Sequence, residues 1–423
     1  MLPRDRSRLS RGSRPHDDRR PRAPHSPGST RDRGESVTGL AETAAELPSG
    51  LPPFGLDVVD DTPEVVIDLH RLRRNITRAA AAAAEHGVDL RPHVKTHKLP
   101  PVAELQIEAG ATGIQVAKLG EAEVFAAAGF TDIFIGYPLV GPRKIARLLE
   151  VLRTTESKIS VAADAMEVAI PLAAAAARAG VTVPVVIEVD TGMHRLGAQP
   201  GRATVELAAR LADLEGIEVT GLFTHEGHVY TQAHSMDEKR AMTRAACAAL
   251  AETADLVRGS GIPLTTVSVG SSGTFRFAID CENITEVRPG TYVFNDLSQL
   301  LQGAATAEEL AAYVVVTVVG RPEATRVVID AGSKVLTSDR LLTPDPAVTF
   351  GAAAGHPGAH IVRLSEEHGV LEVPPGADIR IGDRLAVVPN HICPVINLAD
   401  GVSVVDDGIL ADRWTVAARG RVK

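Results

Sequence analysis

From about residue 62 onward, short β-branched runs alternate with alanine-rich stretches that have apolar positions at helical spacing. Runs that are apolar on both faces are typical of parallel strands covered by helices. Eight runs are predicted as such strands: 89–94, 113–117, 132–137, 158–163, 183–190, 218–224, 265–269 and 285–294. Helices are expected between them, for example at 101–109, 119–128 and 203–214. This alternation predicts βαβ units around a parallel sheet.

The number of predicted strands favours one architecture, a TIM-type (β/α)8 barrel in the α/β class. A doubly wound open sheet is the alternative, but no G-x-G-x-x-G follows the first strand. A helix over 65–84, entered through Thr62 and Pro63, is expected to lead into the barrel. Residues 51–61 would then pack on the β domain that is predicted after Leu310.

The pattern changes after Leu310, where short runs rich in valine and isoleucine are separated by Gly, Pro and Asp turns. Strands are expected at 313–319, 325–330, 360–364, 369–373 and 384–388, and no long helix is evident. The chain is therefore predicted to have three parts: a tail (1–50), the barrel (51–305) and a smaller, mostly β domain (306–423).

The tail and the overall composition limit the possible settings. Residues 1–50 are rich in Arg, Ser, Pro and Gly with little to bury, which predicts disorder, and their acidic residues are unusual for a transit peptide. The net charge of -9 over 423 residues argues against nucleic acid or an anionic membrane as partner. No apolar run reaches membrane-spanning length. Three cysteines far apart in sequence (Cys247, Cys281, Cys393) favour a reducing cytoplasm over a disulfide framework.

The densest chemical signal is the segment Arg91-Pro92-His93-Val94-Lys95-Thr96-His97-Lys98, which lies at the end of the first predicted strand. Catalytic groups of such barrels lie at the carboxyl ends of the strands. A lysine that is partly desolvated there among other cations becomes a nucleophile able to form a Schiff base. A solvated basic patch is the alternative, and the motif alone does not separate the two.

Two further segments lie where barrels commonly hold a phosphate group, in the loops after strands seven and eight. They are Gly270-Ser271-Ser272-Gly273-Thr274 and Arg288-Pro289-Gly290-Thr291-Tyr292. Small residues leave backbone N–H groups open to an anion. Such a turn is weak evidence alone, and its place in the strand order strengthens it.

Three more segments carry polar side chains that can take part in chemistry. Arg195 follows the fifth strand and His225 ends the sixth, although each also fits a turn or a core histidine. His391 and Cys393, two apart on an expected strand, would point to one side and could share a metal ion. Two ligands suit a catalytic ion completed by water and substrate. A buried cysteine beside a core histidine is the alternative.

These segments in this order resemble the fold-type III pyridoxal-phosphate proteins, and more narrowly the D-threonine aldolase and D-serine dehydratase family, from about residue 55 to 415. The resemblance implies that Lys95 holds pyridoxal 5'-phosphate as a Schiff base. The implied phosphate-binding residues are Ser271, Ser272, Gly273, Thr274, Gly290 and Thr291. Arg288 would face the pyridine nitrogen with support from His225, and Arg195 would face the cofactor oxygen or the substrate carboxylate. His391 and Cys393 would bind a divalent metal, zinc or manganese, and the cysteine favours zinc.

The implied activity is that of a metal-assisted lyase for small D-β-hydroxy amino acids. The family resemblance favours an aldolase of the D-threonine type, which releases glycine and an aldehyde, as the first candidate. A dehydratase of D-serine or 3-hydroxy-D-aspartate, which releases a 2-oxo acid and ammonia, is the alternative. A racemase needs a second base, commonly a tyrosine, and Tyr313 is the only tyrosine after residue 300. A non-catalytic cofactor carrier would lack so large a second domain. Relatives include dimers and monomers, so a homodimer is compatible with the sequence.

Overall fold

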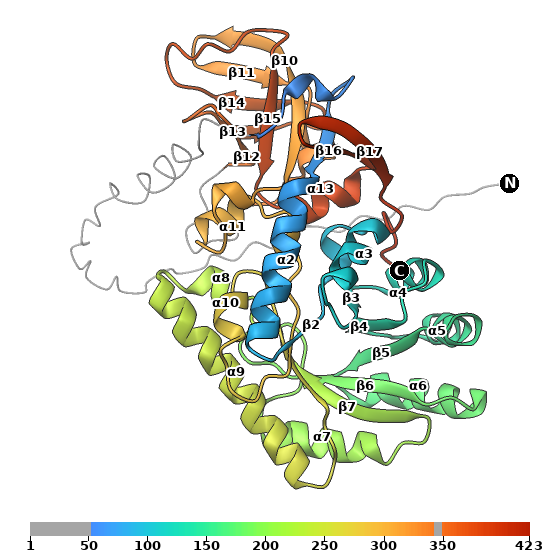
Figure 1. Ribbon diagram of the computed structural model, residues 1–423. Helices are drawn as coiled ribbons and strands as arrows, with labels where there is room; N and C mark the ends of the chain where they lie inside the picture. Colours follow the sequence, from blue (N-terminus) through green and yellow to red (C-terminus); the bar gives the residue numbers. More distant parts are fainter. Residues whose placement is uncertain (1–51, 342–348) are drawn as a thin grey trace, which may run out of the picture.

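The computed structural model describes residues 52–341 and 349–423, so the predicted disordered tail (1–50) lies outside the described residues. Within these ranges the chain forms two sheets (Figure 1). Eight parallel strands form the first, in the order β2-β9-β8-β7-β6-β5-β4-β3, and nine strands form the second. The predicted barrel and the mostly β second domain are both confirmed. No helix in the described ranges is long and apolar enough to span a membrane.

The barrel strands are short and largely buried. They are β2 (Asp89–Leu90), β3 (Ile114–Val116), β4 (Asp132–Pro138), β5 (Lys158–Ala163), β6 (Val183–Glu188), β7 (Ile217–Phe223), β8 (Thr266–Val269) and β9 (Glu286–Val287). An isolated bridge between His93 and Gln115, together with a hydrogen bond from Gln115 N to Pro92 O, connects the segment after β2 to β3. The eight strands therefore curl into a barrel.

The first and eighth strands are much shorter than the predicted runs 89–94 and 285–294. Pro92 and Pro289 follow these strands, and proline has no N–H to donate to a strand neighbour. Beyond the prolines the chain forms one-turn 3-10 segments at Val94–Thr96 and Thr291–Val293. Lys95 and Thr291 consequently lie in tight turns at the rim of the barrel.

Helices surround the barrel (Figure 1). The longer ones are α2 (Leu69–Glu85), α3 (Pro100–Glu108), α4 (Leu119–Ala127), α5 (Pro142–Thr154), α6 (Met166–Ala179), α7 (Arg202–Ala212) and α9 (Met236–Gly259). Three short helices follow the last barrel strands: α8 (Val229–Gln232), α10 (Phe275–Ala278) and α11 (Leu297–Leu301). Each longer helix contributes buried apolar residues to the core cluster that also contains the strand residues, as expected for a barrel of this type.

The second sheet has the order β11-β14-β13-β12-β15-β10-β1-β16-β17. Its strands are β1 (Glu64–Asp68), β10 (Ala312–Glu323), β11 (Arg326–Ile329), β12 (Gly351–Ala353), β13 (His360–Leu364), β14 (Gly369–Glu372), β15 (Arg384–Pro389), β16 (Gly401–Asp406) and β17 (Ile409–Thr415). Two short helices, α12 (Ser333–Leu336) and α13 (Ile392–Leu398), complete the domain. The five predicted strands are present, and β1, β12, β16 and β17 were not predicted.

The helix predicted over 65–84 is wrong in its first residues, because β1 occupies them. β1 pairs with β10 in antiparallel and with β16 in parallel orientation. Val65, Val66 and Ile67 are β-branched and buried, which suits a central strand better than a helix start. The helix begins only after Asp68, whose side chain accepts a hydrogen bond from Arg71 N at 2.8 Å.

The residues that precede β1 pack on the second domain, as the sequence predicted. Phe54 and Val59 belong to a buried cluster with Tyr313 and Val315 of β10. The rings of Phe54 and Tyr313 meet edge to face, with centroids 5.7 Å apart. The described part of the chain therefore begins in the second domain, forms the barrel and then returns to the second domain.

Asn75 of α2 gives a test of this arrangement. Its Nδ2 donates to the carbonyls of Val293 (3.1 Å) and Glu309 (2.8 Å), in the segment that leaves the barrel. Because Asn75→Ala leaves both buried carbonyls without this donor, we expect the free energy of unfolding in urea to fall by about 2–4 kcal/mol. His70→Ala, at an exposed position of α2, is the control and should change it by less than about 0.5 kcal/mol. Equal changes in the free energy of unfolding for the two variants would contradict the proposal that Asn75 joins α2 to the segment that leaves the barrel.

Candidate active site

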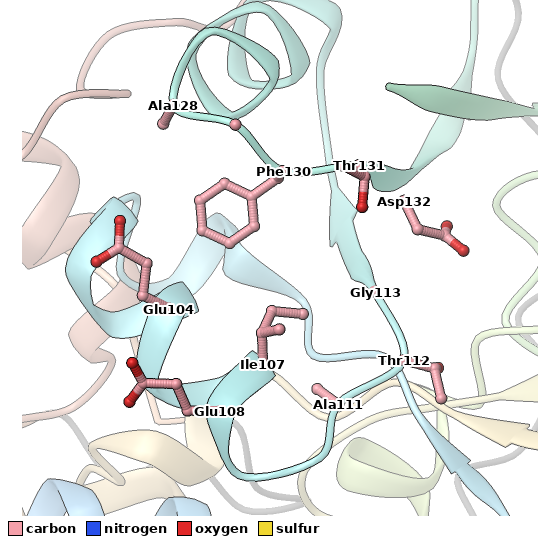
Figure 2. A pocket seen from close by; sticks show the side chains of 11 residues that line it. Glu104, Ile107, Glu108, Ala111, Thr112, Gly113, Ala128, Phe130, Thr131 and Asp132 are labelled. Atoms are coloured by element: carbon pink, nitrogen blue, oxygen red, sulfur yellow. The ribbon is translucent and has the colours of Figure 1, made fainter. Parts of the chain in front are cut away.

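Two cavities lie at opposite ends of the barrel strands. One, of about 300 Å³, lies where β3 and β4 begin; Figure 2 shows Phe130 and Ile107 facing each other across it, beside the carboxylates of Glu104 and Glu108. Its lining contains no lysine, histidine or cysteine. The other, of about 500 Å³, lies at the carboxyl ends of the strands and contains Lys95. Barrel enzymes place their chemistry at that end, so the larger cavity is the candidate active site.

Both domains contribute to the larger cavity. The predicted site residues that line it are Lys95, Arg195, His225, Ser271, Ser272, Arg288, Gly290, Thr291, His391 and Cys393. Gly273 and Thr274 belong to the same loop and are buried behind the lining. Polar side chains of the lining to which the sequence assigned no role are those of His93, Thr96, Gln115, Tyr137, Tyr230 and Gln299.

Lys95 extends from a 3-10 turn into the cavity. Its surface is accessible from the cavity, while protein surrounds it on the other sides. Burial lowers the pKa of the Lys95 amine; Cys393 opposes this shift, and the charge of Arg195 adds to it. A lower pKa increases the fraction of neutral amine, which is the nucleophilic form.

The other cations of the lysine motif have structural partners. His97 and Lys98 are 0% and 5% exposed. Lys98 Nζ lies 3.1 Å from Glu121 Oε1 and donates to Asn397 Oδ1 at 2.7 Å, which joins the motif to α4 and α13. Arg91 is paired with two carboxylates. The alternative of a solvated basic patch is therefore wrong.

Two neutral imidazoles lie beside Lys95. His93 Nδ1 bonds to Gln115 O at 3.1 Å, and His225 Nδ1 bonds to Gly270 O at 2.8 Å. A carbonyl only accepts, so Nδ1 carries the hydrogen in each ring. Burial, reinforced by the charge of Lys95, holds the pKa of His93 well below its ordinary value and lowers that of His225 to about 3. His225 thus bonds to the loop at Gly270, and its support of Arg288, which the family resemblance implies, stays a prediction.

Arg288 is fixed from several sides. Its side chain donates from Nε to Gln115 Oε1 at 3.0 Å, from Nη2 to Thr224 O at 2.6 Å, and from Nη1 to Ser268 Oγ. The guanidinium also lies over the ring of Phe223, 5.1 Å from its centroid. Arg288 is 3% exposed, and these bonds compensate for the burial of its charge.

A buried carboxylate holds the loop that follows β8. Glu226, 0% exposed, accepts hydrogen bonds from Gly270 N at 3.1 Å and from Thr274 Oγ1 at 2.5 Å. The hydroxyl of Tyr230 bonds to the Ser271 side chain and to the backbone of Gly273. Both ends of the loop are thereby fixed before any ligand binds.

The same loop is joined to the segment after β9. Ser272 Oγ accepts from Gly290 N and Tyr292 N, each at 3.1 Å. The backbone N–H groups of Ser271 and Ser272 have no acceptor among the residues that the structure describes. A Cβ on Gly290 would lie 2.8 Å from Thr96 Oγ1, so only glycine allows this close approach of the two rim segments.

His391 and Cys393 lie at the start of α13, so their predicted placement on a strand is wrong. Pro389 ends β15, and Pro394 occupies the first helical turn, where its missing N–H costs nothing. The two side chains nevertheless converge, because they hydrogen-bond to each other. Cys393 Sγ also lies 3.3 Å from Thr96 Oγ1.

Neighbouring groups orient this pair. His391 Nδ1 lies 2.9 Å from Asp339 Oδ2, which leaves Nε2 for the thiol or for a metal ion. Asp296 Oδ2 accepts from Ile392 N at 3.1 Å, between the two side chains, and Ser298 Oγ donates to Asn390 O at 2.7 Å. The segment that leaves the barrel thus holds the backbone of the pair through Asp296 and Ser298 at the start of α11.

Comparisons with known proteins agree over both domains. The alanine racemase N-terminal domain family matches residues 67–298, and a putative serine dehydratase domain matches residues 311–405. D-threonine aldolase of Arthrobacter sp. is 36% identical over 363 residues, which cover 85% of this chain and 93% of that protein. D-threo-3-hydroxyaspartate dehydratase of Delftia sp. is 36% identical over 349 residues, with coverage of 79% and 91%. The crystal structure of D-threonine aldolase from Filomicrobium marinum superposes with a TM-score of 0.79 at 31% identity, covering 86% and 97%.

The chain belongs to the D-threonine aldolase and D-serine dehydratase family of fold-type III pyridoxal-phosphate enzymes. The larger cavity fits the cofactor of this family. It combines a lysine of lowered pKa with a loop whose two N–H groups are open to a phosphate. The cations of Arg195 and Arg288 match the anionic cofactor and a substrate carboxylate in charge.

The donor pair also fits the chemistry of a divalent metal. Among the described residues, no group of three or more His, Cys, Asp or Glu side chains is placed to hold an ion. An imidazole and a thiol with lowered pKa therefore offer two ligands, which leaves room for water or substrate. Burial opposes the lowering of the Cys393 pKa, and the charge of His391 and hydrogen bonds from His391 and Thr96 outweigh it.

Several positioning residues were missed by the sequence reasoning. His93 lies two residues before Lys95 and Glu226 directly follows His225, so the segments already singled out contained both. Asp296 and Asp339 lie in no recognisable motif. They reach the site only through the folding of distant segments.

Glu188, at the end of β6, gives a pH-dependent test of the electrostatics. Burial raises the pKa of its carboxyl to about 7, although Arg195, 3.9 Å away, lowers it. Because the unfolded carboxyl ionises near its ordinary value of 4.5, Glu188 destabilises the fold progressively as the pH rises from 4.5 to 7. We expect Glu188→Gln to raise the free energy of unfolding at pH 8 by up to about 3 kcal/mol, and to have no effect at pH 4.

Thermal or urea unfolding across this pH range measures the effect. Glu218→Gln, an exposed position on β7, is the control and should show no such pH dependence. A destabilised Glu188→Gln protein at pH 8 would mean that the ion pair with Arg195 outweighs the burial of the carboxylate.

Proposed function

We propose that this protein is a metal-assisted lyase of the D-threonine aldolase type, which cleaves a small D-β-hydroxy amino acid into glycine and an aldehyde. The observation that carries the proposal is that Lys95 and the His391–Cys393 pair open into one cavity, with Thr96 in contact with the thiol. The dehydratase of Delftia sp. matches at the same identity as the Arthrobacter aldolase. Release of ammonia and a 2-oxo acid from D-serine or 3-hydroxy-D-aspartate is therefore the second candidate.

Lys95 is the residue proposed to hold the cofactor and to move protons. When bound, pyridoxal phosphate supplies an electron sink for the bond that breaks at the substrate Cα. The lowered pKa of Lys95 suits attack on the aldehyde carbon of the cofactor. With cofactor and substrate bound, a neutral Lys95 amine would serve as a base that takes a proton and returns it.

The loop and the two arginines are proposed to orient the bound molecules. The N–H groups of Ser271 and Ser272, fixed through Glu226 and Tyr230, would bind the phosphate. Arg288 is held rigidly, which suits a contact with the ring nitrogen. Arg195 is half-exposed at the cavity rim and is the candidate for the substrate carboxylate or the cofactor oxygen.

His391 and Cys393 are proposed to hold the divalent ion, and the thiol favours zinc over manganese. A metal ion there would supply Lewis-acid polarisation of the substrate β-hydroxyl. Asp339 would orient His391 through Nδ1. A cysteine-to-alanine mutant of the related D-threo-3-hydroxyaspartate dehydratase has been solved in a metal-free form, which supports a role for a metal in this family.

The racemase alternative loses support from the position of Tyr313. This tyrosine is fully buried in the second domain, and its hydroxyl bonds to Leu310 O at 3.0 Å. It does not line the cavity. The second domain instead contributes the imidazole of His391 and the thiol of Cys393 to the cavity.

A product assay tests the activity. We expect the purified protein, supplied with pyridoxal phosphate and Zn²⁺ or Mn²⁺, to convert D-threonine to glycine and acetaldehyde and to leave L-threonine unchanged. Lys95→Ala should lower the rate by at least about 10³-fold, because both the attachment and the proton transfer are lost. It should also lose the visible absorbance of the attached cofactor.

Lys158 is an exposed lysine at the start of β5, at the end of the barrel opposite the cavity. Lys158→Ala is the matched control and should retain both the activity and the cofactor absorbance. Release of a 2-oxo acid and ammonia from D-serine or 3-hydroxy-D-aspartate, without cleavage of D-threonine, would favour the dehydratase. Full activity of Lys95→Ala would contradict its assignment.

The metal half of the proposal has a separate test. We expect Cys393→Ala to retain the cofactor absorbance, to bind Zn²⁺ at least about tenfold more weakly in a competition with a chelator, and to lose activity. Treatment of the wild-type protein with EDTA should have the same effect on activity, reversed by added metal. Cys281→Ala, outside the cavity, should bind metal as the wild type does. Unchanged affinity of Cys393→Ala would contradict the metal site.

A further inference from the structure

A second group of reactive side chains lies away from the candidate active site. A groove of about 450 Å³ lies between α9 and the turn that follows α10. Cys247 of α9 and Cys281 of that turn both line it, together with Arg244. These two cysteines are distant in the sequence, and the fold brings their side chains together.

The two thiols contact each other as a hydrogen-bonded pair. Cys247 is 2% exposed, whereas Cys281 is half-buried and accessible from the groove. Cys281 Sγ also lies 3.4 Å from Phe277 O, in α10. Both are free cysteines in this structure. A disulfide needs its sulfur atoms about 2 Å apart, so a pair already in hydrogen-bond contact requires only a small movement to form one.

We propose that Cys247 and Cys281 form a reversible disulfide by exchange with a low-molecular-weight disulfide, with Cys281 reacting first. The Cys281 thiolate attacks one sulfur of the small disulfide, its S–S bond breaks, and one small thiolate leaves. Cys247 then releases its proton to solvent, attacks Cys281 Sγ and displaces the second small thiolate. Two protein thiols are oxidised, and one small disulfide is reduced to two thiols.

The surroundings of the pair support this order. The hydrogen bond with Cys247 lowers the pKa of Cys281; burial opposes the shift, and the charge of Arg244 adds to it. The same hydrogen bond, together with burial, raises the pKa of Cys247. A thiol that is accessible and of lowered pKa is the one that attacks first. Cys247 is placed behind it as the resolving thiol.

The disulfide would connect α9 to a segment that supports the loop after β8. α10 begins directly after Thr274, and Cys281 lies just beyond its end. Figure 1 shows α9 and α10 side by side on one flank of the barrel. Oxidation of the pair would therefore attach the helix behind this loop to the longest helix of the barrel.

Peptide mapping tests the proposal on the full-length protein loaded with pyridoxal phosphate. The protein is incubated with glutathione disulfide at pH 8, digested without reduction and examined by mass spectrometry. We expect a cross-linked peptide pair containing Cys247 and Cys281, loss of two of the three free thiols, and recovery of both after dithiothreitol. Absence of this cross-link, or a link to Cys393 in its place, would overturn the proposal.

Single variants test the order of reaction. Cys247→Ser should stop at a stable mixed disulfide of Cys281 with one glutathione. In Cys281→Ser, the buried Cys247 should stay unmodified; reaction at the wild-type rate would overturn the assigned order. Arg244→Gln keeps both thiols and should slow formation of the cross-link several-fold. An unchanged rate of cross-link formation in Arg244→Gln would overturn the role given to the charge of Arg244. This test does not depend on whether the cysteine variants fold.

Discussion

The hydrogen bonds between the start of α11 and residues 390–392 are the constraint on which the active site depends. Asp296 and Ser298 belong to the segment that leaves the barrel, and they bind the backbone on both sides of His391. The imidazole and the thiol come from the second domain, whereas Lys95 and the phosphate-type loop come from the barrel. Without these bonds, the backbone that carries His391 and Cys393 would lose its direct attachment to the barrel segment at the start of α11. A shift of about 1 Å is enough to impair catalysis that relies on positioned groups.

The path of the chain supports the same alignment. The first described strand, β1, lies in the second sheet and leads directly into α2 of the barrel. The C-terminal segment returns to the barrel, where Ala418 N donates to Lys98 O at 3.2 Å. Lys98 itself reaches Asn397 of α13. The lysine motif is therefore attached to the second domain at a point only three residues from Lys95.

The charge state of the cavity differs from the net charge of the chain, and burial decides which of its side chains are charged. The protein carries a net charge of -9, yet the cavity at the carboxyl ends of the barrel strands contains Lys95, Arg195 and Arg288. Both imidazoles next to Lys95 are neutral, because burial and the neighbouring cations lower their pKa values. Because both rings are neutral, they add no positive charge that would repel the three cations. The cavity is left basic enough for an anionic ligand, with a lysine that can still lose its proton.

The sequence predicted the barrel well, because the eight buried runs and the helices between them are local patterns. It also predicted that Lys95 and the loop after the seventh strand lie at the carboxyl ends of the strands. It failed where distant segments decide the structure. Residues 65–68 are a strand only because β10 and β16 flank them, and Pro389 and Pro394 convert the expected strand at His391 into a helix start. Asp296, Asp339 and the Cys247–Cys281 contact depend on tertiary packing and left no signal in local spacing. The cavity wall contributed by the second domain likewise depends on tertiary packing. Here that wall presents an imidazole and a thiol held by Asp339 and Thr96, while Tyr313 stays in the core.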